Sequence, residues 1–288
     1  MEVVRHTDPR KFLAAIDRGD DGFEARNNLV FGVAGTLIER PGLYETFLLW
    51  TVEADGAVLA AAVHTPPWRP ALADTADQDA VRTLAAAIHE DIGTIEGILG
   101  NLPTVDWFAT AWTDLTGIDP EVVMREGVFQ LDKVAEVSTP PGTARSGTAA
   151  DEELLVCWFM DFLTEALPHE SPNEEHARRN VRLRLDDNPT NGVWVWEVDG
   201  EVVSLSGYGG PTPNGARIGP VYTPPDLRGH GYATALVAAQ TQWLLDHGRR
   251  FCFLFTDLAN PTSNAIYERI GYRKVAEAVD YKFQVPIG

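Results

Sequence analysis

The sequence predicts an α/β protein built from two halves of similar size. Apolar segments with strand periodicity alternate with amphipathic helical segments in both halves, which is the pattern of helices packed on a sheet. A stretch of small residues, Pro and Gly at 138–147 separates the halves and is typical of a domain boundary. We therefore expect one domain at 1–137 and a second at 138–288.

Composition narrows the class of protein. The 288 residues are 44% hydrophobic and 23% charged, which is typical of a folded globular chain. Lys and Arg number 23 against 42 Asp and Glu, and the net charge of -19 repels nucleic acid and anionic membranes, so neither is an expected partner. The N-terminus has no apolar signal core, and no apolar run of about 18 residues occurs. We expect a soluble, cytoplasmic protein; its oligomeric state stays open.

The cysteines and histidines argue against disulfides and metals. Cys157 and Cys252 both lie in apolar segments, so two buried thiols are expected. The seven histidines show no metal-binding spacing, so no metal is expected.

The first half is expected to contain helices, a hairpin and further strands. Before the helix that starts near residue 77, the chain reads TPPWRPALADTADQD, with three prolines and no glycine, so few backbone donors remain there for an anion. The expected elements are helices at 9–16, 22–40, 77–91 and 103–117, a hairpin of strands 47–53 and 58–64 that turns at Ala54-Asp55-Gly56, and strands at 94–99 and 128–134.

The second half repeats a similar order. Thr148 and Asp151 form the pattern of a capping box before a helix at 152–166, and Ser171-Pro172-Asn173-Glu174 forms another before a helix that reaches Leu185. Strands at 194–198 and 202–208 turn at Asp199-Gly200. The segment VHTPP at 63–67 is similar to VYTPP at 221–225. Five residues are too few to establish a duplication, and by element order the first copy could end a different strand.

A strand at 216–222, a glycine loop and a helix from Tyr232 form the most informative unit. The loop Arg228-Gly229-His230-Gly231-Tyr232-Ala233 places backbone N–H groups where a helix begins, which favours binding of phosphate. A P-loop would need GxxxxGK[ST], which is absent, and a dinucleotide fingerprint would need Gly or Ala in place of Thr234.

This unit resembles motif A of the GCN5-related N-acetyltransferases (GNAT), R/Q-x-x-G-x-G/A, through Arg228, Gly231 and Ala233. The strand at 251–255 follows, and residues 260–272 resemble the family's N-x-x-A-x-x-[LI]-Y-x-x-x-G-[FY] helix, with Ser263 as a departure. The resemblance implies two tandem GNAT folds, each with a mixed central sheet flanked by helices. The second half would be catalytic and the first a degenerate copy; an unrelated α/β cap is the alternative.

The resemblance also implies a site for acetyl-CoA. Tyr267 matches the tyrosine that donates a proton to the departing thiolate, although it could be a core tyrosine. Asn260 matches a cofactor-contacting asparagine, although Asn before Pro is also an ordinary N-cap. The backbone of the strand end would pair with the pantetheine arm and the loop would hold the pyrophosphate; the residues concerned are Val221, Tyr222 and Thr223, then Arg228, Gly229, His230, Gly231, Tyr232 and Ala233.

The catalytic base stays open, with Glu197, Tyr208, Asp257, a relay of water or no enzymic base as alternatives. The expected activity is transfer of an acetyl group from acetyl-CoA to a primary amine of a small molecule, by direct attack. The alternatives are an amino-acid or longer-chain N-acyltransferase and a non-catalytic sensor that binds acyl-CoA.

Overall fold

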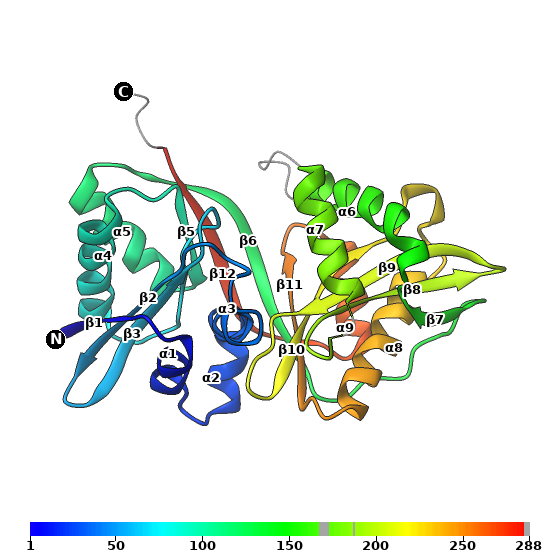
Figure 1. The fold of residues 1–288 in the computed structure, drawn as a ribbon, viewed down its shortest axis with the longest axis horizontal. Helices are drawn as coiled ribbons and strands as arrows, with labels where there is room; N and C mark the ends of the chain where they lie inside the picture. The colour runs from blue at the N-terminus through cyan, green and yellow to red at the C-terminus, as the bar shows by residue number, and fades with distance from the viewer. Residues whose placement is uncertain (167–172, 187, 285–288) are drawn as a thin grey trace. The chain divides into compact units, whose positions relative to one another are not determined.

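The computed structural model describes residues 1–166, 173–186 and 188–284. It divides the chain into two compact units. The first contains residues 1–129, 256–259 and the chain from Lys274 onward; the second contains residues 130–255 and 260–273. In each unit helices pack on both faces of a sheet (Figure 1), as the α/β prediction required.

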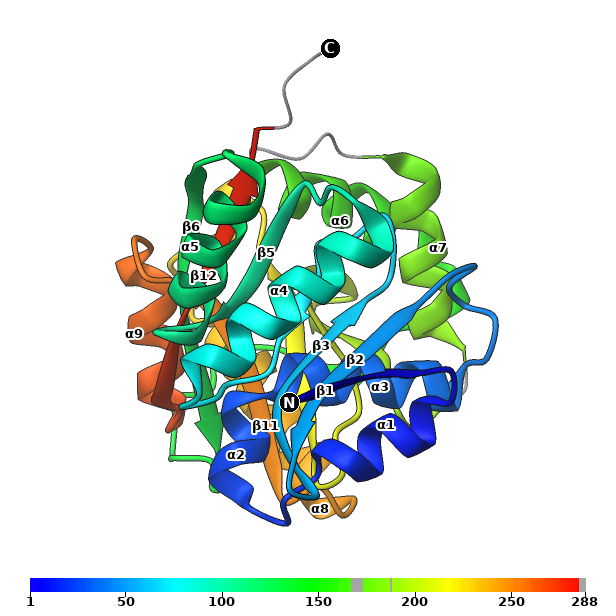
Figure 2. The same cartoon turned by 90° about the vertical axis from the view of Figure 1, so that its left-hand side faces the viewer.

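The first unit has the strand order β1-β2-β3-β4-β5-β12-β6. Helices α4 and α5 pack on one face of this sheet around Trp112, and α1 to α3 pack on the other around Phe31 (Figure 2). The elements are β1 (Glu2–His6), α1 (Pro9–Ile16), α2 (Asp21–Arg26), α3 (Asn28–Glu39), β2 (Leu48–Ala54), β3 (Ala57–His64), β4 (Ala71–Leu72), α4 (Gln78–Ile92), β5 (Gly97–Asn101), α5 (Thr104–Thr116), β6 (Pro120–Leu131) and β12 (Arg273–Phe283).

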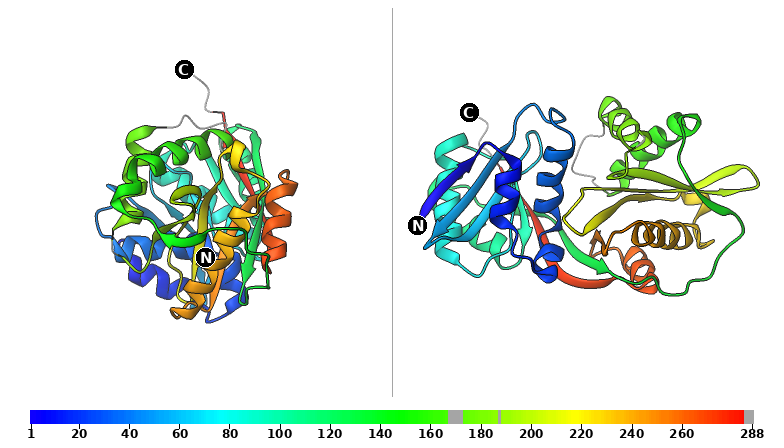
Figure 3. Two further views of the ribbon diagram at one scale, coloured as in Figure 1. Left: turned by 90° about the vertical axis from the view of Figure 1, so that its right-hand side faces the viewer. Right: turned by 60° about the horizontal axis from the view of Figure 1, so that its bottom comes forward.

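The second unit has the strand order β11-β10-β9-β8-β7. Helices α6 and α7 cover one face and α8 the other (Figure 3). The elements are β7 (Thr143–Ser146), a 3-10 turn η1 (Ala149–Asp151), α6 (Glu152–Ala166), α7 (Glu174–Leu185), β8 (Gly192–Val198), β9 (Glu201–Gly209), β10 (Gly215–Tyr222), η2 (Pro225–Leu227), α8 (Tyr232–Asp246), β11 (Phe251–Asp257) and α9 (Pro261–Ile270).

Most predicted elements are present, and the capping box of Thr148 and Asp151 is confirmed. The single helix predicted at 22–40 is wrong, because the chain breaks at Asn27 into α2 and α3. The second predicted capping box is also wrong: Asn173 is the N-cap of α7, and its Oδ1 accepts from the His176 N–H at 2.9 Å. Ser171 and Pro172 lie outside the described residues.

Three short strands were not predicted. β1 and β4 complete the sheet of the first unit, and β7 occupies part of the stretch predicted as a linker. VHTPP ends β3, whereas VYTPP ends β10. Because β10 is the counterpart of β4 in element order, the similarity relates different strands and is not a trace of duplication.

The last strand of the chain belongs to the first unit. β12 pairs antiparallel with β5, from Ala278 opposite Asn101 to Lys282 opposite Gly97. The compact units are therefore not continuous stretches of sequence. The domain boundary predicted between residues 137 and 138 divides the sequence and not these compact units, and it stays a prediction.

The two cysteines differ in environment. Cys252 is buried, and burial raises the pKa of its thiol to about 12. Cys157 is exposed on α6, so the prediction of two buried thiols is wrong for this residue. Among the described residues, no helix is long and apolar enough to cross a bilayer.

Candidate active site

β10 and β11 run parallel but pair over only three residue pairs, from Gly215 with Phe251 to Arg217 with Phe253. β10 continues to Tyr222, and in the described structure no further pairing with β11 follows. The backbone of β10 beyond Arg217 is therefore open on this edge. An extended chain could add to it through main-chain hydrogen bonds.

A bulge at Gly219–Pro220 disturbs β10 on its other edge. The antiparallel register with β9 shifts between Ile218 and Val221. Gly219 has a φ of 141°, which L residues with a side chain rarely adopt. The bulge reverses the alternation of side chains, so Tyr222 packs toward α6 and the strand end is held in the core.

The loop between β10 and α8 ends in an open helix N-terminus. Gly229 and Gly231 have φ values of 83° and 84°, and no atom lies within 4 Å of the position that a Cβ would take at either. Gly231 is the N-cap of α8, and among the described residues no side chain caps this end. The N–H groups of the first helical turn also have no acceptor within the helix. They present donors and the positive end of the helix dipole to an anion.

Arg228 fastens this loop to the end of β10. Its Nε donates to the Thr223 carbonyl at 2.8 Å, and its Nη2 donates to Glu165 Oε2 at 2.7 Å. Its guanidinium carbon also lies 5.7 Å from the centroid of the Tyr222 ring. The Tyr222 hydroxyl donates to the same Glu165 at 3.4 Å, and burial together with Glu165 raises the pKa of Tyr222. Glu165, on α6, is a site residue that the sequence did not indicate.

α9 carries Asn260 and Tyr267. Asn260 is the N-cap, and its Oδ1 accepts from the Ser263 N–H at 3.1 Å, so its capping role is observed. Tyr267 lies two turns further along, with its ring centroid 6.1 Å from that of Tyr272. Tyr272 follows the end of α9, and its hydroxyl is 2.8 Å from Thr241 Oγ1 on α8, which links the chain after α9 to α8.

The segment containing β10, the loop and α9 matches a known family model, described as the acetyltransferase (GNAT) family, over residues 153–272. Residues 153–272 are a GNAT domain. The prediction from Arg228, Gly231 and Ala233 is confirmed at the level of the family, which supports an acyltransferase activity dependent on acyl-CoA.

Solved structures extend the similarity in fold to the whole chain. A tandem GNAT protein from the clavulanic acid biosynthesis pathway is 14% identical and has a TM-score of 0.61, with 100% of this chain and 99% of that chain covered. A Drosophila protein is also 14% identical, with a TM-score of 0.70 and 99% of each chain covered. A GCN5-related N-acetyltransferase from Kribbella flavida is 16% identical, with a TM-score of 0.63, and the match covers 92% of this chain and 97% of that one. No curated protein gives a significant match to the sequence. The chain thus has the fold of two tandem GNAT units.

Burial raises the pKa of Tyr267 to about 12, so its phenol stays protonated at neutral pH. Within the described residues its hydroxyl has no hydrogen-bond partner. A protonated phenol at this position can donate a hydrogen bond, so the geometry is compatible with the predicted role of Tyr267.

Of the candidate bases, Glu197 is engaged in an ion pair. Its Oε2 accepts from Arg145 Nε at 2.6 Å, and the same guanidinium donates to both oxygens of Asp151 at 2.8 and 2.9 Å. This pairing raises the pKa of Arg145 and lowers the pKa of Asp151 to about 2. The arrangement holds β7 and the start of α6 to β8, which is a structural role.

Tyr208 and Asp257 also have structural surroundings. The Tyr208 ring is buried with its centroid 6.1 Å from that of Trp243 on α8, and burial raises the pKa of its hydroxyl. Asp257 Oδ1 accepts from the Ala259 N–H at 2.8 Å and so closes the turn before α9. The geometry therefore adds no support for either as the base. Among the described residues, no group of three or more His, Cys, Asp or Glu could hold a metal ion.

The corresponding region of the first unit is closed. α4 follows β4 as α8 follows β10, but its N-cap is Asp77, whose Oδ1 accepts from the Ala80 N–H at 2.9 Å. Next to β4, the Thr75 N–H donates to Thr104 Oγ1 at 3.1 Å, and this hydroxyl donates to the Thr75 carbonyl at 3.1 Å. The Thr104 hydroxyl thus occupies the backbone N–H and carbonyl of Thr75, which an extended ligand would need for pairing next to β4.

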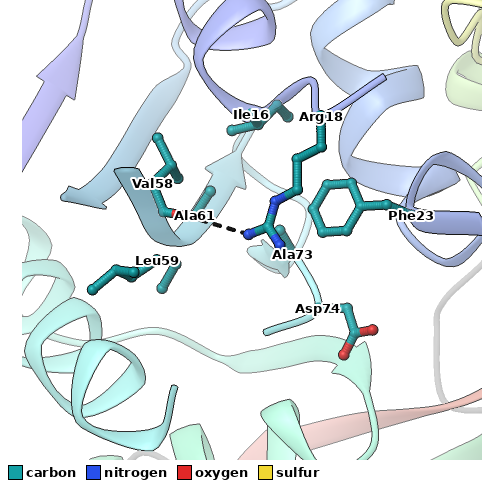
Figure 4. A pocket seen from close by; sticks show the side chains of 9 residues that line it. Ile16, Arg18, Phe23, Val58, Leu59, Ala61, Ala73 and Asp74 are labelled. Carbon is teal, nitrogen blue, oxygen red and sulfur yellow. Dashed lines mark hydrogen bonds between the residues drawn. The ribbon is translucent and has the colours of Figure 1, made fainter. Parts of the chain in front are cut away.

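The first unit also contains a small cavity next to β3 (Figure 4). Arg18 enters it, with its Nη2 donating to the Val58 carbonyl at 3.3 Å and its guanidinium carbon 4.2 Å from the centroid of Phe23. The cavity has a volume of about 10 Å³, room for one water molecule and far too little for an acyl-CoA. A wider hollow of about 850 Å³ adjoins the start of α4, where Asp77 and Asp79 would repel phosphates.

Proposed function

We propose that the protein transfers an acyl group, with acetyl-CoA as donor, to a primary amine of a small molecule. The second unit performs the reaction, and the first is a copy that has lost its cofactor site. The observation that carries the proposal is the combination of an open β10 edge with an uncapped α8 N-terminus, joined by a loop of only nine residues, 223–231.

The parts of this site suit the parts of acyl-CoA. The pyrophosphate would lie at the N–H groups of Gly229, His230, Gly231, Tyr232 and Ala233. The pantetheine arm would run back along β10 and pair with the backbone at Val221 and Thr223. His230 stacks on Tyr232 with ring centroids 5.4 Å apart, an arrangement that leaves their backbone donors as the groups for phosphate. The Asn260 amide Nδ2 would contact the cofactor while Oδ1 caps α9.

In the reaction, the nitrogen of a neutral amine attacks the thioester carbonyl, a C–N bond forms and the C–S bond breaks. The amine loses one proton to water, and the CoA thiolate leaves with a hydrogen bond from the Tyr267 hydroxyl. Loss of sulfur as a stabilised anion is easier than loss of an alkoxide, so one well-placed donor suffices.

Calorimetry with acetyl-CoA and with CoA, followed by thiol release over a panel of amines, tests the proposal. Micromolar binding at one site per chain and release that depends on the amine are the expected results. Binding without release on any amine would favour a sensor of acyl-CoA. Absence of binding would refute the site assignment. Comparison of acetyl-CoA with longer acyl-CoA donors would identify the chain length.

A further inference from the structure

A guanidinium lies on the face of the β9–β10 pair at the bulge. Arg184 comes from the last turn of α7. A Cβ placed on Gly207 of β9 would lie 3.0 Å from Arg184 Nε, 2.8 Å from the Gly219 carbonyl oxygen and 2.9 Å from Pro220 Cδ. Arg184 therefore fills the space that a side chain at Gly207 would need, directly against the bulge.

Arg184 is held in this position from two sides. Its Nη1 donates to the carbonyl of Asn180 at 3.2 Å and to the Oδ1 of the same residue at 3.1 Å. Its guanidinium carbon lies 5.9 Å from the centroid of the Phe159 ring on α6. The side chain is half-buried, and these contacts fix the orientation of its guanidinium.

Arg217 brings a second cation to this face. Its neighbour Ile218 lies opposite Tyr208, which packs on Trp243 of α8, so Ile218 points toward α8. Because side chains alternate along a strand, Arg217 points to the face covered by α6 and α7. Its Nη2 lies 3.1 Å from the position of a Cβ on Gly210.

The acceptor has to approach the thioester from this same face. A pantetheine arm that pairs with Val221 and Thr223 brings its acyl end to the bulge, further back along β10. The opposite face is filled, since the Ser206 hydroxyl donates to Gln240 Oε1 at 2.6 Å and Gln240 Nε2 donates to the Ser206 carbonyl at 2.8 Å. Both side chains are fully buried. The substituents of the acceptor would therefore contact Arg184.

We propose that the acceptor amine carries a carboxylate, as an amino acid does, and that Arg184 binds this carboxylate. The inference rests on the proposed function, because it places the acyl group at the bulge. A guanidinium suits a carboxylate because the charge-assisted hydrogen bonds between them are strong. The phosphates of CoA do not compete for it, because they lie at the other end of β10, beyond Tyr222.

Matched acceptors with and without a carboxylate test this specificity. The pairs are glycine with methylamine, L-alanine with ethylamine and L-phenylalanine with phenethylamine. The natural protein is expected to prefer the carboxylate member of at least one pair by tenfold or more in kcat/KM. Arg184→Gln should raise KM for that member at least tenfold, with little change for its partner, and Arg184→Lys should restore part of the loss.

The control is Arg182→Gln, on the same helix, which removes an ion pair with Glu152 and should leave the preference unchanged. Equal activity on both members of every pair would overturn the inference while the acyltransferase function stands. An equal loss on both members in Arg184→Gln would also overturn it, because a purely structural role predicts that result.

A binding measurement keeps the inference testable without turnover. N-acetylglycine should bind at least tenfold more tightly than N-methylacetamide, and Arg184→Gln should remove the difference. If neither compound binds, or both bind equally, the inference is wrong. Calorimetry with CoA reports separately on the proposed function, so the two failures are distinguishable.

Discussion

The N-termini of α8 and α4 occupy the same place in the element order and have opposite properties. At α8 the N-cap is Gly231 in a left-handed conformation, with open space around it. At α4 the N-cap is Asp77, which uses its carboxylate to satisfy the helix. The N-terminus of α8 therefore offers backbone N–H donors to an anion. At the N-terminus of α4, the Asp77 side chain occupies a donor and adds a negative charge.

The strands before these helices differ in the same sense. β10 leaves β11 after three residue pairs and has an open edge. β4 has two residues, and the chain after it is closed by the paired hydrogen bonds of Thr75 and Thr104. In α9 the residue seven places after the N-cap is Tyr267, whereas in α5 it is Thr110, whose hydroxyl donates back to the Asp106 carbonyl. The two units therefore have a similar fold, but the backbone donors are occupied at this place in the first unit and open in the second.

The largest expected effect comes from giving α8 the aspartate that α4 has. Gly231→Asp adds a side chain and a negative charge where the phosphates would lie, so CoA affinity should fall at least a hundredfold, by about 3 kcal/mol or more. Calorimetry measures the loss. The control is Gly200→Asp, since Gly200 also has a positive φ, 85°, and open space around it.

Both variants should lose about 1 kcal/mol of stability from the left-handed conformation, but only Gly231→Asp should lose CoA. Retention of affinity in Gly231→Asp would refute the phosphate-loop assignment. A similar loss of affinity in both variants would attribute the effect to folding.

Local sequence was sufficient to predict the loop before α8 and the helix α9, which are each continuous in the chain. The loop from Arg228 to Ala233 and the helix with Asn260 and Tyr267 depend on glycines, a cap and spacing within about twelve residues. Such features form from neighbouring residues, so the sequence carries them directly.

The features that the sequence did not predict depend on contacts between residues far apart in the chain. Glu165 and Arg228 are 63 positions apart, and β12 finds its partner in β5. No Gly or Pro at Asn27 marks the break between α2 and α3 in the sequence. The Asn27 side chain instead accepts a hydrogen bond at 2.5 Å from the Asp74 N–H, 47 positions away. Tertiary contacts determine these features, so they cannot be predicted from the hydrophobic periodicity of a single segment.

The second effect concerns Tyr267 on α9, which stands where α5 has Thr110. Tyr267→Phe should retain CoA affinity and slow turnover at least tenfold, because the departing thiolate loses its donor. Since burial raises the Tyr267 pKa to about 12, loss of its proton should not lower the rate of the natural protein below about pH 10. Steady-state kinetics across pH 6–10 check both statements.

The control for Tyr267→Phe is Tyr272→Phe, which removes a hydroxyl that is buried against Thr241. It should lower thermal stability and leave turnover per folded molecule unchanged. Unchanged turnover in Tyr267→Phe would exclude the phenol from the mechanism.

The smallest effect is expected from the reverse exchange, Asp77→Gly. Glycine is a tolerated N-cap, so the loss of stability should be only about 0.3 kcal/mol in thermal or denaturant unfolding. If the cap alone had silenced the first unit, the variant would bind a second CoA. Because the hydrogen bonds of Thr75 and Thr104 still occupy the backbone beside β4, calorimetry should give one CoA per chain, as in the natural protein. Binding of two CoA per chain would mean that the Asp77 carboxylate, and not the closed strand edge, prevents the first unit from binding CoA.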